Sequence, residues 1–164
     1  MKHTLLAACL LLTATSATSA FADEAADCSA AAGAYRTGVV VRGPAFAHGQ
    51  YRKGVELSHT HLTMKADQDG RIYDVAIDNV FVPGFDRGQK GIPAPLTAIH
   101  VNDRIGVCGQ LYTKGVGIHW VHTNCGKRPT PSHPDGWLKE LKPDGTAGPS
   151  VTGNPAFCPI FKSR

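Results

Sequence analysis

The segment from Lys114 to Leu138 concentrates the side chains of this chain that are best suited to binding and proton transfer. It holds both tryptophans and three of the eight histidines: His119, Trp120, His122, His133 and Trp137. An indole offers a large apolar face together with an N–H donor. An imidazole binds metals, moves protons and donates hydrogen bonds near neutral pH. Proline and glycine interrupt the segment, so we predict that these five residues form the rim of a binding site.

A second group is His59-Thr60-His61. Residues two apart in a strand point to the same face, so these two imidazoles would lie side by side. Such a pair can chelate zinc or another divalent transition metal, with a third ligand from His119, His122 or His133. The spacing of His119 and His122 sends them to opposite faces of a regular strand, although a bulge or strand end could reunite them. The alternative is a pair of exposed or hydrogen-bonded histidines without metal.

Asp74 and Asp78 form a third group, on one face of a predicted strand that begins near Arg71. The stretch RIYDVAIDNVFVP faintly resembles a strand of the exported staphylococcal-type nucleases, which hold Ca²⁺ and a phosphodiester with acidic groups and arginine. It departs from that pattern because Asn79 follows Asp78 and no Pro-Glu pair comes after it. The resemblance implies phosphodiesterase chemistry, and the alternative is a solvated strand face with Asp78 capping a turn.

Nucleophilic catalysis has little support. The chain contains no Gly-x-Ser-x-Gly element. Ser58 precedes His59 directly, and neighbouring residues of a strand face opposite sides, so the two are poorly placed as a dyad.

The N-terminus has the pattern of a secretory signal peptide. A short polar start at Lys2 leads into an apolar run from Leu5 to Leu12, and small residues continue to Ala20-Phe21-Ala22. This ending fits a small-x-small cleavage site, and the apolar run is too short to span a bilayer. We therefore expect residues 1–22 to be removed and the mature chain to begin at Asp23, in the periplasm or outside the cell.

The segment Leu6-Ala7-Ala8-Cys9 superficially resembles a lipoprotein cleavage box. The apolar run continues past Cys9, however, whereas a lipoprotein signal would end there. Cleavage after Ala22 is therefore favoured over lipidation.

Four cysteines remain after this cleavage, and in an exported chain they predict two disulfides. None of them has CxxC spacing, which disfavours a zinc knuckle or a thioredoxin-like site. Three pairings are open. We favour Cys28–Cys158, which would tie the two ends of the domain, together with Cys108–Cys125, whose members lie on or near neighbouring predicted strands.

The charge of the chain is mild. The formal net charge is +4, and its basic residues are scattered rather than clustered. This pattern favours solubility and makes only a weak case for nucleic acid as a partner. No later segment is apolar enough to cross a membrane. The partner that we expect is an unidentified ligand or protein.

Periodicity predicts a mainly β domain. We expect a short helix over 23–34 and a helical turn over 137–141. The expected strands cover 35–42, 55–64, 71–82, 104–112 and 116–123, and long loops cover 83–95 and 124–136. Five short strands and one initial helix favour a small five-stranded OB-like barrel with disulfide-tied ends. We place this domain at 23–142, before a Gly/Pro-rich tail at 143–164.

The block GQLYTKGVGIHWVHTNCG, followed by HPDGWLK, resembles a family of small exported bacterial proteins known only as a domain of unknown function. The matching residues are Gly109, Gly115, Gly117, Ile118, His119, Trp120, His122, His133, Gly136, Trp137, Leu138 and Lys139. The added cysteines, the longer loop at 83–95 and a longer insert before His133 depart from the family pattern. The resemblance implies an OB-like fold and export, and it carries no activity.

These observations favour an exported, non-enzymatic binding domain of unknown ligand. Trp120 and Trp137 would stack against a sugar ring, a base or a peptide, unless both are core residues. The first alternative is a metal-dependent hydrolase acting on phosphodiesters. The second is a purely structural periplasmic module.

Overall fold

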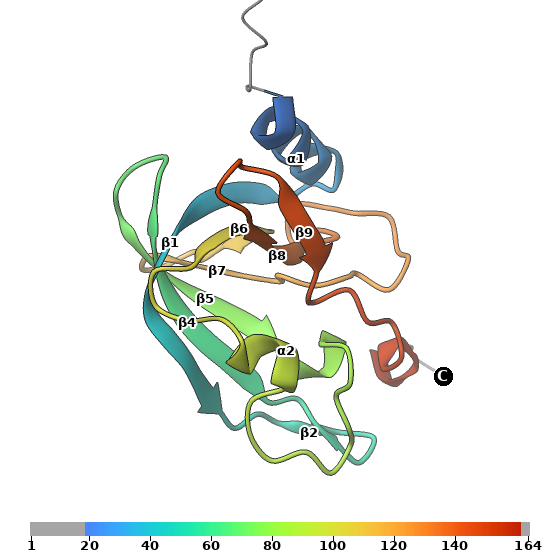
Figure 1. Cartoon of the computed structure of the whole chain (residues 1–164). Coiled ribbons are helices and arrows are strands. Elements are labelled where there is room, and N and C mark those ends of the chain that lie inside the picture. Colours follow the sequence, from blue (N-terminus) through green and yellow to red (C-terminus); the bar gives the residue numbers. More distant parts are fainter. Residues whose placement is uncertain (1–18, 162–164) are drawn as a thin grey trace, which may run out of the picture.

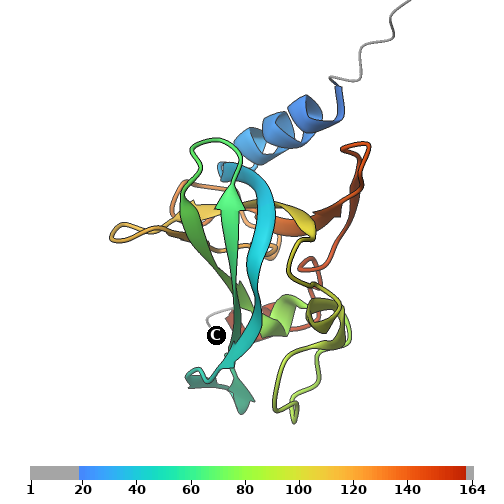
Figure 2. The same cartoon turned by 60° about the vertical axis from the view of Figure 1, so that its left-hand side comes forward.

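The computed structural model describes residues 19–161, and this part of the chain is mainly β. Its helical elements are α1 (Ser19–Ala30), η1 (Asn79–Phe81), α2 (Ala94–Thr97) and η2 (Cys158–Phe161). Its strands are β1 (Ala34–Ala47), β2 (Tyr51–Arg52), β3 (Val55–Glu56), β4 (His59–Ala66), β5 (Ile72–Asp78), β6 (Arg104–Leu111), β7 (Gly117–His119), β8 (Trp137–Leu141) and β9 (Ala147–Ser150). Figure 1 shows α1 at one end of the sheet and the β2–β3 hairpin at the other, and the turned view in Figure 2 agrees.

The predicted signal peptide lies mostly outside the described residues, and only its last four positions fall within α1. The short N-terminal helix that we expected after it is present, shifted toward the N-terminus. Between residues 19 and 161, no helix combines the length and the apolar character needed to cross a bilayer.

The main sheet contains seven strands in the order β1-β4-β5-β7-β6-β8-β9, where we expected five. β1 is long enough to pair with β4 and also with β6. Its register against β4 shifts twice between Val40 and Ala45, and such irregularities bend a strand and increase its twist. β5 and β7 pair in parallel, whereas the other neighbouring strands of this sheet are antiparallel.

The alternation of side chains along β4 and β5 is as predicted. On β4, Thr60, Leu62 and Met64 are buried, whereas His59 and His61 are partly exposed. On β5, Tyr73, Val75 and Ile77 are buried, whereas Asp74 and Asp78 are partly exposed. The polar groups of both strands therefore share the outer face of the sheet, because side chains alternate with a period of two.

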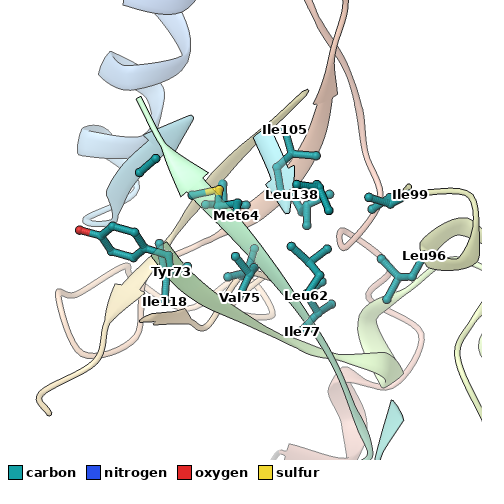
Figure 3. Packing of buried hydrophobic residues seen from close by; sticks show 14 of the residues in the cluster. Leu62, Met64, Tyr73, Val75, Ile77, Leu96, Ile99, Ile105, Ile118 and Leu138 are labelled. Carbon is teal, nitrogen blue, oxygen red and sulfur yellow. The ribbon is translucent and has the colours of Figure 1, made fainter. Parts of the chain in front are cut away.

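The core fills the inner face of this sheet. Leu62, Ile105 and Leu138 are at most 1% exposed, and they come from three different strands. Figure 3 shows Leu96 and Ile99, from α2 and the turn after it, lying on the side of Leu62 and Leu138. Burying one such aliphatic side chain contributes roughly 1.5–3 kcal/mol, so this segment is held to the sheet by its apolar contacts.

The helical turn that we predicted from Trp137 to Leu141 is wrong, because this segment forms strand β8. It pairs with β6, with Val107 opposite Leu138. β6 supplies the backbone partners, and Leu138 becomes fully buried in the core. The segment 143–164, which we expected to be a tail, contributes β9 to the same sheet.

The predicted disulfide pairing is also wrong. The bonds are Cys28–Cys108 and Cys125–Cys158, rather than Cys28–Cys158 and Cys108–Cys125. Tyr35 of β1 lies opposite Cys108, so the chain that leaves α1 passes beside the middle of β6. Gly33 permits this approach, because a Cβ there would lie only 2.4 Å from the Cys108 sulfur.

The second bond, Cys125–Cys158, closes a separate apolar cluster that includes Phe81 and Phe85. The two ends of the domain are therefore tied to its body and not to each other.

Peptide mapping of the unreduced protein tests this pairing. We expect one linked fragment that joins Cys28 to Cys108 and another that joins Cys125 to Cys158. Replacing either pair with alanine should lower the free energy of unfolding by up to roughly 4 kcal/mol, because each bond restricts the unfolded chain. A fragment that joins Cys28 to Cys158 would contradict the structure.

Candidate functional site

The outer face of β4, β5 and β7 carries a hollow of about 330 Å³, here named the histidine pocket. Its lining residues are His59, His61, Ala76, Asp78, Tyr112, His119 and Trp120. His61 pairs with Ala76 across β4 and β5, and Val75 pairs with Ile118 across β5 and β7. His119 is the next residue of β7, so His61 and His119 flank Ala76. The small side chain of Ala76 leaves the floor of the pocket open between the two imidazoles.

Asp78 holds two of the histidines. One carboxylate oxygen contacts His59 Nε2, and the other lies 2.7 Å from His122 Nε2. The His122 side chain is only 3% exposed, and its Nδ1 lies 2.7 Å from the carbonyl oxygen of Thr123. Both ring nitrogens of His122 therefore face an oxygen acceptor. The nearly buried His122 is thus fixed next to Asp78, which lines the pocket.

Contacts with Asp78 and burial shift the pKa values of the titratable groups in the pocket. Burial acts to raise the pKa of Asp78, but hydrogen bonds from His122 and His59 outweigh it and hold that pKa well below its usual value. The hydrogen bond to Asp78 raises the pKa of His59. Burial lowers the pKa of His119, only partly opposed by the charge of Asp78. Two imidazoles of one pocket are thus driven toward opposite protonation states.

Asp74 contacts two further residues that line the pocket, His61 and Tyr112. Both of its oxygens lie 3.0 Å from His61 Nδ1, and the Tyr112 hydroxyl donates to one of them at 2.5 Å. Burial, followed by this hydrogen bond, raises the pKa of Tyr112 above its ordinary range. Tyr112 therefore acts as a neutral donor that fixes the carboxylate.

A buried polar network fixes the position of Asp78 at the end of β5. The Thr60 hydroxyl donates to Asn79 Oδ1 at 2.6 Å, and Asn79 Nδ2 donates to Ser58 Oγ at 3.1 Å. All three side chains are at most 1% exposed. The Asp78 side chain makes no hydrogen bond to the 3₁₀ turn that follows, so the turn-capping role that we considered for it is not observed.

Trp120 separates the histidine pocket from a second hollow. It follows the last residue of β7 and has a left-handed backbone, with φ of 52°. Such a conformation is uncommon for residues other than glycine, and it turns the chain sharply after the strand. After this turn His122 contacts Asp78, whereas His119 lines the histidine pocket without a hydrogen bond to that carboxylate. Trp120 is partly exposed and lies outside the buried core.

The second hollow, here named the cationic pocket, has a volume of about 490 Å³. Its lining residues are Arg52, Asp78, Phe81, Trp120, His122, Thr123, Asn124, Cys125, Lys127, Arg128, Thr130, His133 and Phe161. The ring of His133 meets that of Trp120 edge-on, with centroids 4.7 Å apart. The ring of His122 stacks on Phe81 at 4.0 Å. The two pockets share Trp120 and Asp78, so they are neighbouring parts of one surface.

Asn124 has an unused acceptor in this cationic pocket. Its side chain is 5% exposed, and its amide nitrogen donates to the Lys127 carbonyl at 2.8 Å, which fixes the orientation of the amide. The amide oxygen, Oδ1, is buried and accepts no hydrogen bond from residues 19–161. A buried acceptor without a partner costs roughly 1–3 kcal/mol.

The structure brings together most of the predicted binding residues. His119, Trp120, His122 and His133 all line the two pockets. Trp137 lines neither of them. It packs against Tyr35 on β1, and the Lys139 ammonium lies 4.4 Å from the centre of its ring.

The predicted metal pair, His59 and His61, lies in the histidine pocket with ring centroids 6.3 Å apart. Each ring faces a different carboxylate, Asp78 or Asp74. In the described part of the chain, no group of three or more histidine, cysteine or acidic side chains is arranged to hold a metal ion. Each of the two imidazoles thus has a carboxylate partner of its own.

Sequence reasoning missed three contributors to this surface. Tyr112 directly follows β6, and its role depends on a carboxylate from another strand. Asn124 has no motif that marks it. Arg52 is distant in sequence from the histidine-rich segment, whereas the adjacent pair Lys127-Arg128 lies within that segment.

No family model, curated protein or solved structure matches this chain. The resemblance to the exported domain family therefore stays a prediction, and the site must be understood from its own geometry.

The shifted pKa values predict how stability depends on pH. The lowered pKa of Asp78 contributes stability that is present above the ordinary value of 3.8 and is lost as the pH falls below it. The raised pKa of His59 contributes stability that is present below the ordinary value of 6.5 and is lost as the pH rises through the raised value. Urea unfolding of the wild type and Asp78→Asn should differ most near pH 5.5, and less near pH 3 and pH 9. A difference that stays constant over this range would contradict the ion-pair arrangement.

Proposed function

We propose that this protein is an exported binding protein whose site is the surface on both sides of Trp120. Its ligand carries an anionic group and a flat ring, as a nucleotide unit does. The observation that carries this proposal is the cationic pocket, which combines an aromatic wall with three cations.

The cations supply the first argument. Arg52, Lys127 and Arg128 line the pocket, and all three are exposed. None of them forms an ion pair with an acidic side chain within residues 19–161. Arginine is well suited to phosphate because its planar guanidinium donates two parallel hydrogen bonds. Unpaired cations around a hollow favour an anion such as phosphate.

The second argument concerns the uncharged part of the ligand. Trp120 offers a partly exposed indole face at the wall of the pocket, and stacking of a base on such a ring contributes about 1–3 kcal/mol. A base and a phosphate joined in one ligand would engage both Trp120 and the cations.

The arrangement of the strands also fits this proposal. The pairings β1–β4, β4–β5, β5–β7, β7–β6 and β6–β1 connect five strands in a ring. This ring supports our proposal that the domain is an OB-like barrel to which β8 and β9 are added. OB-fold barrels commonly bind oligonucleotides and oligosaccharides on one face.

Export is supported by the leader pattern and by the two disulfides. All four cysteines of the expected mature chain are paired. Disulfides of this kind persist in oxidising compartments such as the periplasm. A purely structural module would give no reason for the unpaired cations around Trp120.

Binding of a short 2′-O-methyl oligoribonucleotide, measured by fluorescence anisotropy, tests the proposal. Trp120→Ala should weaken binding by about 5- to 150-fold, the equivalent of one lost stacking contact. The melting temperature should change little, because Trp120 lies outside the core. Arg128→Ala should weaken binding and reduce its dependence on salt.

Arg42→Ala is the matched control for charge, since Arg42 is exposed on β1 and lines neither pocket. Equal effects of Arg42→Ala and Arg128→Ala would contradict a defined site and indicate nonspecific attraction. A large loss of stability in Trp120→Ala would assign this residue to the core.

A further inference from the structure

The histidine pocket contains two imidazoles that can act on the same bound group. His119 stands on β7 and His59 on β4, on either side of β5. Neighbouring strands lie about 4.8 Å apart, so the two backbones are roughly 10 Å from each other. His59 pairs with Asp78 and His119 lies beside Ala76, so the two histidines are also offset by two residues along β5. Both side chains line the same hollow of about 330 Å³.

The two imidazoles are held differently. His59 is anchored through Nε2 to Asp78, which leaves Nδ1 as its other donor. A carboxylate that orients an imidazole and stabilises its protonated form is a recurrent device in enzymes. The ring of His119 forms no hydrogen bond within the described residues and meets Tyr112 edge-on at 5.4 Å. It is therefore available to accept a proton from a ligand.

Resting on the proposed function, we infer that the histidine pocket cleaves bound RNA by internal phosphoryl transfer, with His119 as general base and His59 as general acid. His119 removes the proton from a ribose 2′-hydroxyl, and the 2′ oxygen attacks the adjacent phosphorus. The bond between phosphorus and the 5′ oxygen breaks, and His59 donates a proton to that oxygen. The products are a 2′,3′-cyclic phosphate and a 5′-hydroxyl, and the reaction requires no metal, water or oxidant.

The pKa directions support these roles. The pKa of His59 is raised, which favours the protonated form of an acid, and that of His119 is lowered, which favours the neutral form of a base. Pairs of groups whose environments push their pKa values apart commonly mark acid and base roles.

A bound RNA strand has a continuous path along this site. A third hollow of about 270 Å³ adjoins the histidine pocket and shares His119 and Tyr112 with it. Its lining includes Lys114, whereas the cationic pocket on the other side carries Arg52, Lys127 and Arg128. Cations thus stand at both ends of a row of hollows, and the histidines lie between them.

Both acidic and basic groups face the two histidines. The titratable groups around them are Asp74 and Asp78 on β5, His61 on β4, Tyr112 after β6, His122 after β7 and Lys114 in the adjacent turn. Asp78 is paired with His59 and His122, and Asp74 with His61 and Tyr112. Each carboxylate is therefore held by two side chains.

In this mechanism the substrate supplies its own nucleophile, so we expect the substrate to be RNA. The 2′-hydroxyl attacks within the strand, and proton transfer by the two imidazoles is sufficient. DNA has no such hydroxyl, so a DNA strand should bind without being cut.

The test compares cleavage of a fluorescent RNA oligonucleotide with that of DNA of the same sequence, in excess EDTA, by the full-length disulfide-bonded protein. We expect RNA to be cut to a cyclic phosphate and DNA to remain intact. His119→Ala and His59→Ala should each lower the rate by at least 100-fold. His100→Ala, an exposed histidine outside both pockets and purified in the same way, should retain the full rate.

Two further measurements separate catalysis from structure. The rate should follow a bell-shaped pH profile, with its acid limb below the ordinary histidine value of 6.5 and its alkaline limb above it. Ala76→Leu should fill the floor of the pocket and abolish cleavage, while the protein still binds the 2′-O-methyl strand at the cationic pocket.

Several outcomes would overturn the inference. Tight binding of the 2′-O-methyl strand without cleavage of RNA would leave the proposed function intact and disprove the catalytic role. Failure to bind either strand would disprove the proposed function itself. Equal cleavage of DNA, loss of activity in EDTA, or equal rates for His100→Ala and His119→Ala would each contradict this mechanism.

Discussion

The carboxylate of Asp78 is the constraint on which the rest of this site depends. It stands at the last position of β5 and accepts hydrogen bonds from His59 on one side and His122 on the other. These partners come from segments that are far apart in the sequence. Because His122 is almost fully buried, its pairing with Asp78 also fixes the turn at Trp120. One side chain therefore holds His59, the proposed general acid, and also fixes Trp120 at the boundary between the two pockets.

Much of the outer face could be predicted because it depends on a local rule. Alternation along β4 and β5 places His59, His61, Asp74 and Asp78 on one side of the sheet, and this follows from the sequence once the strands are recognised. The concentration of histidine and tryptophan around Trp120 likewise marked residues that line the two pockets. Local patterns were sufficient here because each residue belongs to a regular strand or to the segment that follows it.

The remaining features depend on contacts between distant segments. The pairing of Cys28 with Cys108 follows from the register of β1 on β6 and the close approach at Gly33, neither of which is visible in cysteine spacing. Trp137 looked equivalent to Trp120 in the sequence, yet its strand places it beside Tyr35 and away from both pockets. The free oxygen of Asn124 can be recognised only when the partners of its amide nitrogen are known.

The most direct test of the account is a crystal structure of the protein with a 2′-O-methyl dinucleotide, which can bind and cannot cyclise. We expect one base to lie against Trp120 and the linking phosphate to lie between the rings of His59 and His119. Ordered dinucleotide elsewhere on the molecule, with neither pocket engaged, would contradict the central claim that the surface around Trp120 is the functional site.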